Sequence, residues 1–543
     1  MLQKKADYEQ TVRAFEWDIP GHYNIGTDVC DKWADGSGRV ALVVEAGPGQ
    51  IKKYTFDQLK GWSDRFAQAL LARGIGRGDR VGVLLPQSLE TAIAHIAIAK
   101  LGAIAVPLFT LFGTEALQYR LANSGTRALV TDDASLKKIT QIRGMLPDLG
   151  TIFSIDGAQA GKARDFWQAI KEQDGDFKAA DTLATDPALI IYTSGTTGKP
   201  KGALHAHQVL PGHLPGVEIS HNFFPDRAEL MWTPADWAWI GGLYDVLMPS
   251  LHHGIPVLAC RMPKFDAETA FALMARHGVT HTFLPPTALK MLRAAGDPAH
   301  HGPFKLVSIA SGGETLGREL VDWGREHLGL TINEFYGQTE CNMIVSSCAA
   351  LFEPRIGAMG RPVPGHDVQI IDDAGERVAV GVEGNIAVRR PDPVMFIEYW
   401  RNPQATADKF IGDFLITGDR GQRDEDGYIW FVGRSDDVIT TAGYRVGPGP
   451  IEDCLLGHPA VNMVAIIGVP DPQRTEAIKA CIVLNAGYEG SPELVAELQQ
   501  HVRDKAAAHE YPRIVEFMDT LPMTTTGKVI RNKLRAMHAA ASH

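Results

Sequence analysis

The stretch YTSGTTGKPKG (residues 192–202) decides how this chain is interpreted, because glycines, hydroxyl side chains and lysines follow an apolar run, ALII (188–191). Glycines let the backbone bend so that its N–H groups converge on an anion, the hydroxyls add hydrogen-bond donors, and the lysines add positive charge. Such a loop is typical of a phosphate-binding site. The candidate phosphate-binding residues are Thr193, Ser194, Gly195, Thr196, Thr197, Gly198, Lys199 and Lys201.

Two other interpretations of this loop were weighed. A Walker A loop has a longer spacer before its Gly-Lys-Ser/Thr, whereas here Gly195 comes only three residues before Gly198 and Pro200 follows Lys199. A flexible Gly/Thr surface turn is the other alternative, and the apolar run before the loop disfavours it.

Length and composition predict a multidomain enzyme. The chain has 543 residues, 45% of them hydrophobic and 22% charged, which is enough for more than one buried core. A net charge of −11 excludes a general nucleic-acid binder. The six cysteines are scattered without a CxxC pair, so we expect reduced thiols and no structural zinc site. No apolar run is long enough to span a membrane, and we expect a cytoplasmic protein.

Apolar runs alternate with amphipathic stretches along most of the chain, as in RVGVLLP (80–86) followed by LETAIAHIAIAKLGA (89–103). This alternation predicts an α/β fold in which a large N-terminal domain (1–434) has mostly parallel sheets with helices. Short strands and turns from about residue 360 onward predict a small antiparallel section. A second α/β pattern predicts a small mobile C-terminal domain (435–543).

Three further stretches contain candidate site residues: FYGQTE (335–340), LITGDRGQRDEDGYIWFVGRSDDVITTAGYRV (415–446) and LPMTTTGKVIRNKL (521–534). Together with the phosphate loop, in this order, they resemble the adenylate-forming (AMP-binding) superfamily over nearly the whole chain. The sequence is most similar to medium-chain acyl-CoA synthetases, which serve fatty acid metabolism.

The resemblance implies a ligase with two half-reactions. A carboxylic acid attacks the α-phosphate of ATP to give an acyl-adenylate and pyrophosphate, and the thiol of coenzyme A then displaces AMP. The implied small molecules are the acid, ATP with Mg²⁺, and coenzyme A, with no prosthetic group. Because two anions must meet in the first half-reaction, cationic groups have to neutralise them.

By resemblance, Lys528 is the catalytic residue that bridges the carboxylate and the α-phosphate; its alternative role is one lysine of a solvated basic tail. A protein lysine acetyltransferase acting on Lys528 is a candidate partner. Glu340 would bind Mg²⁺, with a helix-capping role as the alternative. Asp419 would accept hydrogen bonds from the ribose hydroxyls. The remaining candidate ATP-binding residues are Gly313, Glu314, Thr315, Tyr336, Gly337, Gln338, Thr339, Arg434 and Arg445.

The resemblance also implies that the small domain rotates between the half-reactions about a hinge at Asp436. The rotated face would bring Ala442 and Gly443 to the pantetheine of coenzyme A, and Arg503 to its nucleotide. Relatives usually carry a glutamate where this chain has Pro450, and a basic residue where it has Met523.

The acyl group is predicted to be larger than acetate. Acetate-specific relatives place a tryptophan at the position of Gly337, and glycine leaves the pocket open. Trp237 and Cys341 could form an apolar wall, or they could belong to the core. Straight, branched and aromatic acids are all candidates. Two alternatives remain: an adenylation enzyme that loads a carrier-protein thiol, and a binding protein without catalysis.

Overall fold

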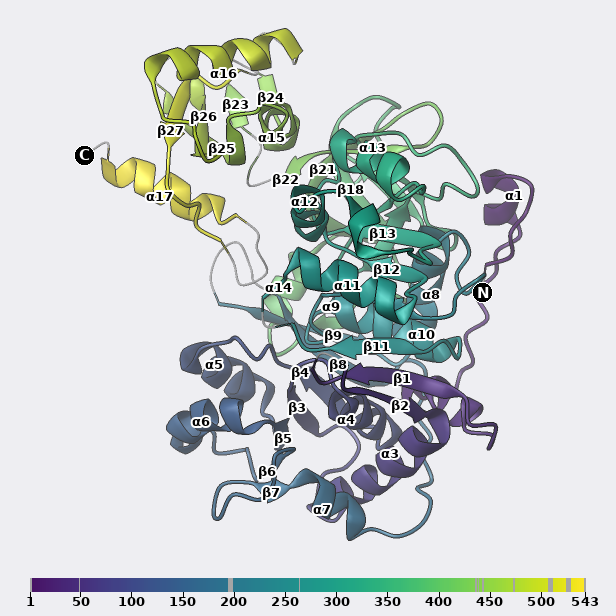
Figure 1. Cartoon of the computed structure of the whole chain (residues 1–543). Coiled ribbons are helices and arrows are strands. Elements are labelled where there is room, and N and C mark those ends of the chain that lie inside the picture. The colour runs from purple at the N-terminus through teal and green to yellow at the C-terminus, as the bar shows by residue number, and fades with distance from the viewer. Residues whose placement is uncertain are drawn as a thin grey trace.

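The computed structural model describes residues 2–541 except 48, 194–198, 263, 435–436, 438, 442–443, 472–473, 506–510 and 524–528. Within these residues the strands form three sheets, of 14, 8 and 5 strands (Figure 1). The mixed α/β class and the antiparallel section after residue 360 are confirmed. In the described part of the chain, no helix is long and apolar enough to cross a membrane.

The eight-stranded sheet is parallel through its centre and antiparallel at the edge that carries the phosphate loop. Its strands, in sheet order, are β19 (Glu398–Tyr399), β9 (Lys201–Ala206), β8 (Pro187–Thr193), β4 (Ile104–Pro107), β3 (Arg80–Leu84), β5 (Ala128–Thr131), β6 (Thr151–Ser154) and β7 (Arg164–Asp165). Its helices are α3 (Phe56–Leu71), α4 (Leu89–Lys100), α5 (Thr114–Ser124), α6 (Asp133–Ile142) and α7 (Phe166–Lys171).

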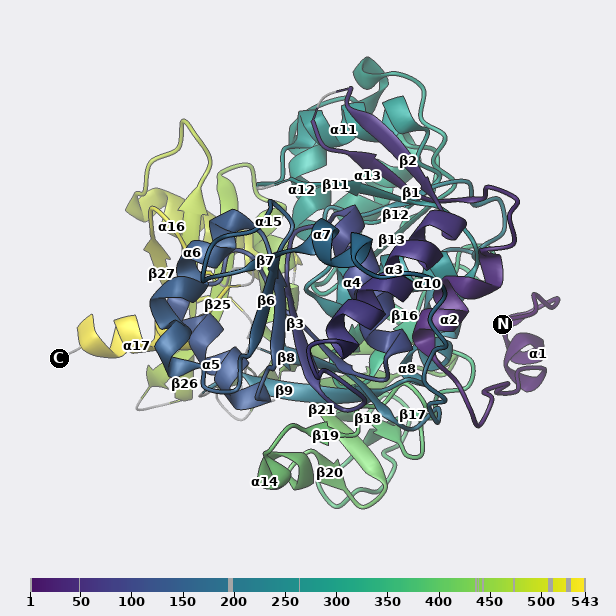
Figure 2. The same ribbon diagram turned by 90° about the horizontal axis from the view of Figure 1, so that it is seen from below.

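Alternating residues of this sheet enter two different cores, as the period of two in a strand requires. On β3, Val81 and Val83 pack with α3 and α4, while Leu84 packs with α5 and α6 on the opposite face. Figure 2 shows these two helix layers on either side of the sheet. Because α4 is apolar all round, it lies buried between the two large sheets, and Ser88 caps its N-terminus by accepting from Thr91 N–H.

The 14-stranded sheet is parallel from β1 to β14, apart from its edge strand β2, and antiparallel beyond β14. Its strands are, in sheet order, β17 (Val368–Ile371), β18 (Gly384–Arg389), β21 (Phe414–Arg423), β22 (Ile429–Arg434), β16 (Ala358–Pro362), β15 (Asn342–Ser346), β14 (Asn333–Gln338), β13 (Ser308–Gly312), β12 (His281–Phe283), β10 (Met231–Trp232), β11 (Val257–Cys260), β1 (Val40–Glu45) and β2 (Ile51–Thr55), with β20 (Phe410–Ile411) beside β21.

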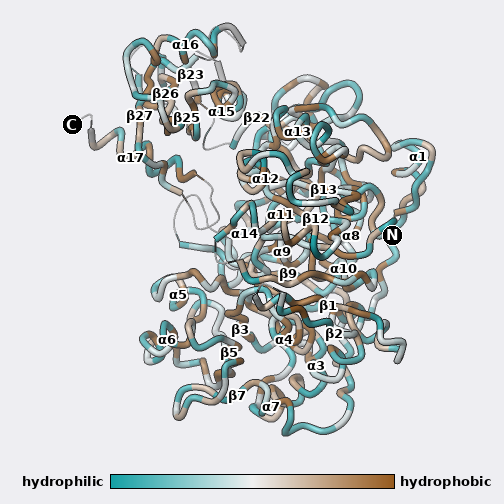
Figure 3. Tube along the Cα trace, in the orientation of Figure 1, coloured by the Kyte–Doolittle hydropathy of each residue, from teal (hydrophilic) through white to brown (hydrophobic). Residues whose placement is uncertain are grey.

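Helices cover both faces of the parallel half of this sheet. One layer, with its own core, is formed by α11 (Ala267–His277), α12 (Pro286–Ala294) and α13 (Arg318–His327). The other layer lies toward the eight-stranded sheet and contains α8 (Val209–Ser220), α9 (Ile240–Gly242), the π-helical turn η3 (Leu243–Leu247) and α10 (Met248–His252). The hydropathy colours of Figure 3 show apolar residues concentrated along the central strands and α4.

The five-stranded sheet belongs to the C-terminal part of the chain and lies at the upper left of Figure 1. Its strands are β24 (Tyr444–Val446), β23 (Ile439–Thr441), β26 (Thr475–Leu484), β25 (Val461–Asp471) and β27 (Ile514–Phe517), and its helices are α15 (Pro448–Leu456), α16 (Pro492–Lys505) and α17 (Arg531–Ala541). It has a core of its own. The remaining helices are α1 (Tyr8–Arg13), α2 (Ile25–Val29) and α14 (Pro403–Ala407).

Candidate active site

The phosphate loop joins two antiparallel strands. Thr193 at the end of β8 pairs with Lys201 at the start of β9, and residues 194–198 between them lie outside the described residues. A Walker loop instead leads from a strand into a helix, so the topology agrees with the sequence argument against one. Lys201 Nζ lies 5.1 Å from the centre of the Tyr399 ring, and Lys199 Nζ lies 5.5 Å from that of Tyr119.

Three predicted ATP-binding residues meet on the strands β14, β21 and β22. The Tyr336 hydroxyl donates to Asp419 Oδ2 at 2.5 Å, and Arg434 Nη1 lies 3.4 Å from Asp419 Oδ1. Antiparallel pairing of Asp419 with Arg434 places both side chains at one position of the sheet. Burial and the nearby Asp419 carboxylate raise the pKa of Tyr336 well above its usual value, so its hydroxyl keeps its proton.

Two hydrogen bonds fix the side chain of Gln338, which is another predicted ATP-binding residue. Its amide nitrogen donates to the carbonyl of Thr417 at 2.9 Å, and its amide oxygen accepts from Lys409 Nζ at 3.0 Å. Lys409 also donates to the carbonyls of Ile416 and Thr417. The ammonium therefore ties the strand that carries Asp419 to the strand that carries Tyr336, and its charge lies beside the predicted nucleotide-binding residues.

Glu340, the predicted magnesium ligand, is buried directly after β14. Its Oε1 accepts from the Tyr399 hydroxyl at 2.5 Å, and its backbone carbonyl accepts from Phe396 N–H. Within the described contacts, Oε2 accepts no hydrogen bond. Burial and the Glu340 charge hold the pKa of Tyr399 far above its usual value, so the phenol remains a donor. These contacts do not include the backbone N–H donors that a helix-capping role of Glu340 would require.

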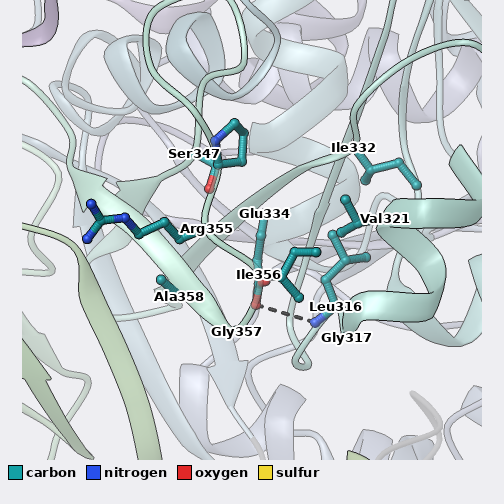
Figure 4. Close-up of a pocket in the computed structure, with 11 residues that line it drawn as sticks. Leu316, Gly317, Val321, Ile332, Glu334, Ser347, Arg355, Ile356, Gly357 and Ala358 are labelled. Atoms are coloured by element: carbon teal, nitrogen blue, oxygen red, sulfur yellow. Dashed lines mark hydrogen bonds between the residues drawn. The ribbon is translucent and has the colours of Figure 1, made fainter. Parts of the chain in front are cut away.

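Glu334 is a buried carboxyl near the predicted site that the motifs did not identify. Its Oε1 accepts from the backbone N–H of Leu316, next to the predicted Gly313–Thr315 stretch, and it borders a cavity of about 10 Å³ (Figure 4). That volume holds about one water molecule. Burial raises the pKa of Glu334 to about 8, so this carboxyl can donate as well as accept at neutral pH.

Gly337 is held by a close backbone contact. A Cβ at this position would lie 1.5 Å from the carbonyl oxygen of Asn342 across the β14–β15 hairpin. Only glycine fits this backbone, a reason that the sequence did not reveal. The predicted wall residues Trp237 and Cys341 are fully buried in the main core.

The predicted residues of the C-terminal part are largely outside the described residues. This holds for Lys528, Asp436, Ala442 and Gly443, and for the side chain of Arg445 on β24. Thr315 and Thr339 are described, in the turn before α13 and directly after β14.

The basic stretch after Lys528 is not a free tail. Arg531 donates to both carboxylate oxygens of Glu452 at 2.7 and 2.8 Å, and Arg535 donates to Asp437 at 2.7 Å. Pro450 lies in the first turn of α15, where its missing N–H breaks no helical hydrogen bond. Glu452 on the same helix is thus the residue that ties α15 to α17.

Arg503 stands apart from the ATP residues, at the end of α16. Its guanidinium carbon lies 3.9 Å from the centre of the Tyr511 ring, and that of Arg513 lies 4.7 Å from the same ring. Neither arginine forms an ion pair with a described residue. The two guanidinium groups that stack on this ring carry positive charge, which favours the binding of an anionic group between or beside them.

Sequence reasoning missed Glu334, Tyr399, Lys409, Tyr511 and Arg513. A signal was available for Glu334, because it lies two residues before Tyr336 and so shares a strand face with it. Tyr399 and Lys409 lie outside the motifs in sequence and reach the predicted site from β19 and from the turn between α14 and β20.

Glu340 and residues 313–315 follow the neighbouring parallel strands β14 and β13 at their carboxyl ends, where ligands commonly bind in α/β sheets. The family model "AMP-binding enzyme" matches residues 30–400, and the model "AMP-binding enzyme C-terminal domain" matches residues 450–528. The chain belongs to the AMP-binding enzyme family.

Relatives span the whole length of the chain. The mitochondrial acyl-coenzyme A synthetase ACSM3 of Mus musculus is 33% identical, covering 98% of this chain and 93% of the relative. The acetyl-coenzyme A synthetase of Bacillus subtilis is also 33% identical, covering 98% and 95%. A crystal structure of the anthranilate CoA ligase AuaEII with anthranoyl-AMP superposes with a TM-score of 0.87 at 30% identity, covering 97% of this chain and 99% of that one.

Proposed function

We propose that this protein is an AMP-forming acyl-CoA synthetase. It activates a carboxylic acid larger than acetate with ATP to an acyl-adenylate, and then forms acyl-CoA with release of AMP and pyrophosphate. The observation that carries the proposal is the convergence of Asp419, Tyr336 and Arg434 next to Glu340. The carboxylates of Asp419 and Glu340 have separate hydrogen-bond partners, so each can serve a different part of ATP. Asp419 would accept hydrogen bonds from the ribose hydroxyls, and Glu340 would bind the metal ion at the phosphates.

The residues present fit Mg²⁺. The described residues contain no cluster of three or more acidic, histidine or cysteine side chains that could hold a metal. Mg²⁺ needs no such cage, because it is commonly bound by one or two carboxylates together with phosphate oxygens and water. Glu340 would supply the carboxylate, oriented by Tyr399. When bound, the ion neutralises phosphate charge and orients the phosphates.

The stack of Arg503, Tyr511 and Arg513 supports coenzyme A as the acyl acceptor. The nucleotide of coenzyme A carries phosphates and an aromatic base, and guanidinium groups bind phosphate while stacking on rings. Lys528 remains the proposed catalytic lysine and Asp436 the proposed hinge. The boundary between the two domains at residues 434 and 435 is likewise a proposal.

The size of the acid does not follow from overall similarity, because relatives named for acetate and for other acyl groups are equally identical. Gly337 does not decide the size either, because the contact across the β14–β15 hairpin already requires a glycine there. The ligase AuaEII, named for the aromatic acid anthranilate, supports an acid of more than two carbons. A role in fatty acid metabolism and a cytoplasmic location are further proposals from the sequence. A lysine acetyltransferase acting on Lys528 stays a prediction.

The experiment is pyrophosphate release by the purified protein with ATP, Mg²⁺ and acids from acetate to decanoate and benzoate. Acyl-CoA is measured in the same reactions. We expect release to depend on the acid, to be greater for acids larger than acetate, and to be followed by free acyl-CoA. Adenylate without acyl-CoA would favour the carrier-protein alternative, and no release with any acid would favour a binding protein.

A further inference from the structure

A buried histidine–aspartate pair joins two helical segments next to the predicted nucleotide-binding residues. His213 on α8 and Asp245 in the π-helical turn η3 lie 2.8 Å apart between Nε2 and Oδ1, with side chains 0% and 8% exposed. Burying charged groups costs free energy unless each is well paired. π-helical turns are rare and occur frequently at functional sites. The pair therefore requires an explanation beyond packing.

Polar groups connect this pair to the active site. His205 on β9 is fully buried, and its ring faces the backbone of Thr339, which precedes the proposed magnesium ligand. Neither ring nitrogen of His205 meets a described hydrogen-bond partner of good geometry, and Nδ1 of His213 is also buried without one. His205 and His213 lie close enough to interact electrostatically. Buried ring nitrogens without a hydrogen-bond partner among the described residues thus lie on His205, near Thr339, and on His213.

The second oxygen of Asp245 is directed toward a glycine. Oδ1 bonds His213, whereas Oδ2 accepts no hydrogen bond from the described residues, and a Cβ added at Gly241 would lie 3.4 Å from it. The same Cβ would lie 2.9 Å from the ring of Phe283, which packs on Phe335 at the nucleotide-binding strand β14. The carboxylate oxygen therefore lies one aromatic layer away from the ATP residues.

We propose that Asp245, oriented by His213, recognises a hydrogen-bond donor at the far end of the acid substrate. This inference rests on the proposed function, which places the substrate carboxylate beside the α-phosphate. The chemical class is then a carboxylic acid with a hydroxyl or amino group, and simple alkyl acids are poorer substrates. Asp245 acts as a specificity-determining residue and His213 as the positioning residue that holds it.

The physical basis is that Oδ2 of Asp245, whose side chain is 8% exposed, accepts no hydrogen bond from the described residues and would lose its contact with water under a bound substrate. A substrate hydroxyl or amine that donates to Oδ2 satisfies it, whereas a methyl group of the same size displaces water and leaves it unpaired. A site built to bond a donor group discriminates strongly against the analogue that lacks it. A pair that only stabilises the fold would not discriminate between two such acids.

The test compares acids in matched pairs by kcat/KM for pyrophosphate release. Each terminal hydroxyalkanoate is paired with the alkanoate in which a methyl group replaces the hydroxyl, and each aminobenzoate with the methylbenzoate of the same ring position. We expect at least one donor-bearing acid to exceed its methyl partner by at least about tenfold. Equal kcat/KM within every pair would overturn the inference and leave the proposed function standing. Absence of release with every acid would overturn both.

Two variants assign the preference to Asp245. Asp245→Leu removes the acceptor and should abolish or reverse the preference, with methyl partners improved. Asp245→Asn keeps the shape of the side chain and should reduce the preference for the donor-bearing acid. If Asp245→Leu does not fold, Asp245→Asn decides whether Asp245 causes the preference. Asp28→Asn is the control, because Asp28 on α2 forms a similar pair with His252 at 2.5 Å, and the kcat/KM ratios of this variant within each acid pair should equal those of the parent. A preference that survives in both Asp245 variants would overturn the inference.

Discussion

The hydroxyl of Tyr336 donates a hydrogen bond of 2.5 Å to Oδ2 of Asp419, across 83 residues of sequence. This bond orients the carboxylate proposed to hold the ribose. A hydrogen bond to a charged group contributes about 1.5–3 kcal/mol. We therefore expect Tyr336→Phe to raise KM for ATP by about tenfold to a hundredfold, with little change in KM for the acid, in steady-state pyrophosphate release.

Tyr8→Phe is a matched control, because the Tyr8 hydroxyl donates to the Pro362 carbonyl away from the site. It should leave KM for ATP unchanged. An equal rise in KM for both substrates of Tyr336→Phe would contradict a specific role at the nucleotide.

The second prediction concerns the partner of the proposed magnesium ligand. Tyr399→Phe removes the donor to Glu340 Oε1, and loss of a group that orients a metal ligand typically costs about 10–100-fold in affinity. We expect the Mg²⁺ concentration for half-maximal activity to rise by about tenfold, and Glu340→Gln to raise it further. Tyr428→Phe, whose hydroxyl donates to the Glu353 carbonyl, should show the parent's Mg²⁺ dependence. An unchanged dependence in Tyr399→Phe would disprove the assignment.

The third prediction concerns Lys528. Removing its charge with Lys528→Ala should slow adenylate formation by at least about a hundredfold, by analogy with loss of one preorganised transition-state donor. Thioester formation from supplied acyl-adenylate should survive. Lys533→Ala on α17 is the control and should retain both half-reactions. Equal loss of both half-reactions in Lys528→Ala would indicate a structural role.

The fourth prediction concerns Gly337. The Cβ of Gly337→Ala would meet the Asn342 carbonyl at 1.5 Å, so the hairpin backbone must shift. We expect a lower melting temperature and lower kcat/KM for short and long acids alike. Gly144→Ala, with no atom within 4 Å of the added Cβ, should behave as the parent. The same clash makes Gly337→Trp a poor probe of acyl size. Unchanged stability of Gly337→Ala would contradict the observed hairpin contact.

The fifth prediction is acid-induced loss of stability. Burial lowers the pKa of His95, His207 and His281 to about 4 and that of His205 to about 3. Below pH of about 6.5 the unfolded chain binds protons at these histidines while the folded chain does not, so stability falls as pH falls. Each such histidine contributes up to about 1.4 kcal/mol per pH unit between the two pKa values.

Glu334 opposes this trend, because its raised pKa of about 8 makes stability fall as pH rises, and Asp236 and Asp453, with pKa values raised to about 6, oppose it in the same way. The four histidines outnumber these three carboxyls once the unfolded histidines are largely protonated, so we expect the urea midpoint to decrease from about pH 6.5 to about pH 5.5. His95→Leu removes one titrating group and should reduce the slope by about one proton. A midpoint independent of pH over this range would contradict buried neutral histidines.

Much of the fold could be predicted because hydrophobic periodicity is local. The run RVGVLLP became β3, and LETAIAHIAIAK became α4 over its full length. The order of strands within a sheet could not be read in this way. Neighbours such as β16 and β22 are brought together by packing between segments distant in sequence, and no local pattern specifies such pairs.

The sequence by itself determined which residue types the proposed nucleotide site contains, because Asp419, Glu340 and Tyr336 lie in motifs whose residue types suit ATP and its metal ion. Only the tertiary structure decided which groups hold them. Tyr399 reaches Glu340 from β19, and Asp245, in a π-helical turn, has one carboxylate oxygen near Gly241. Motifs are contiguous in the chain, whereas orientation and desolvation arise from contacts between distant segments, and these appear only when the chain is folded.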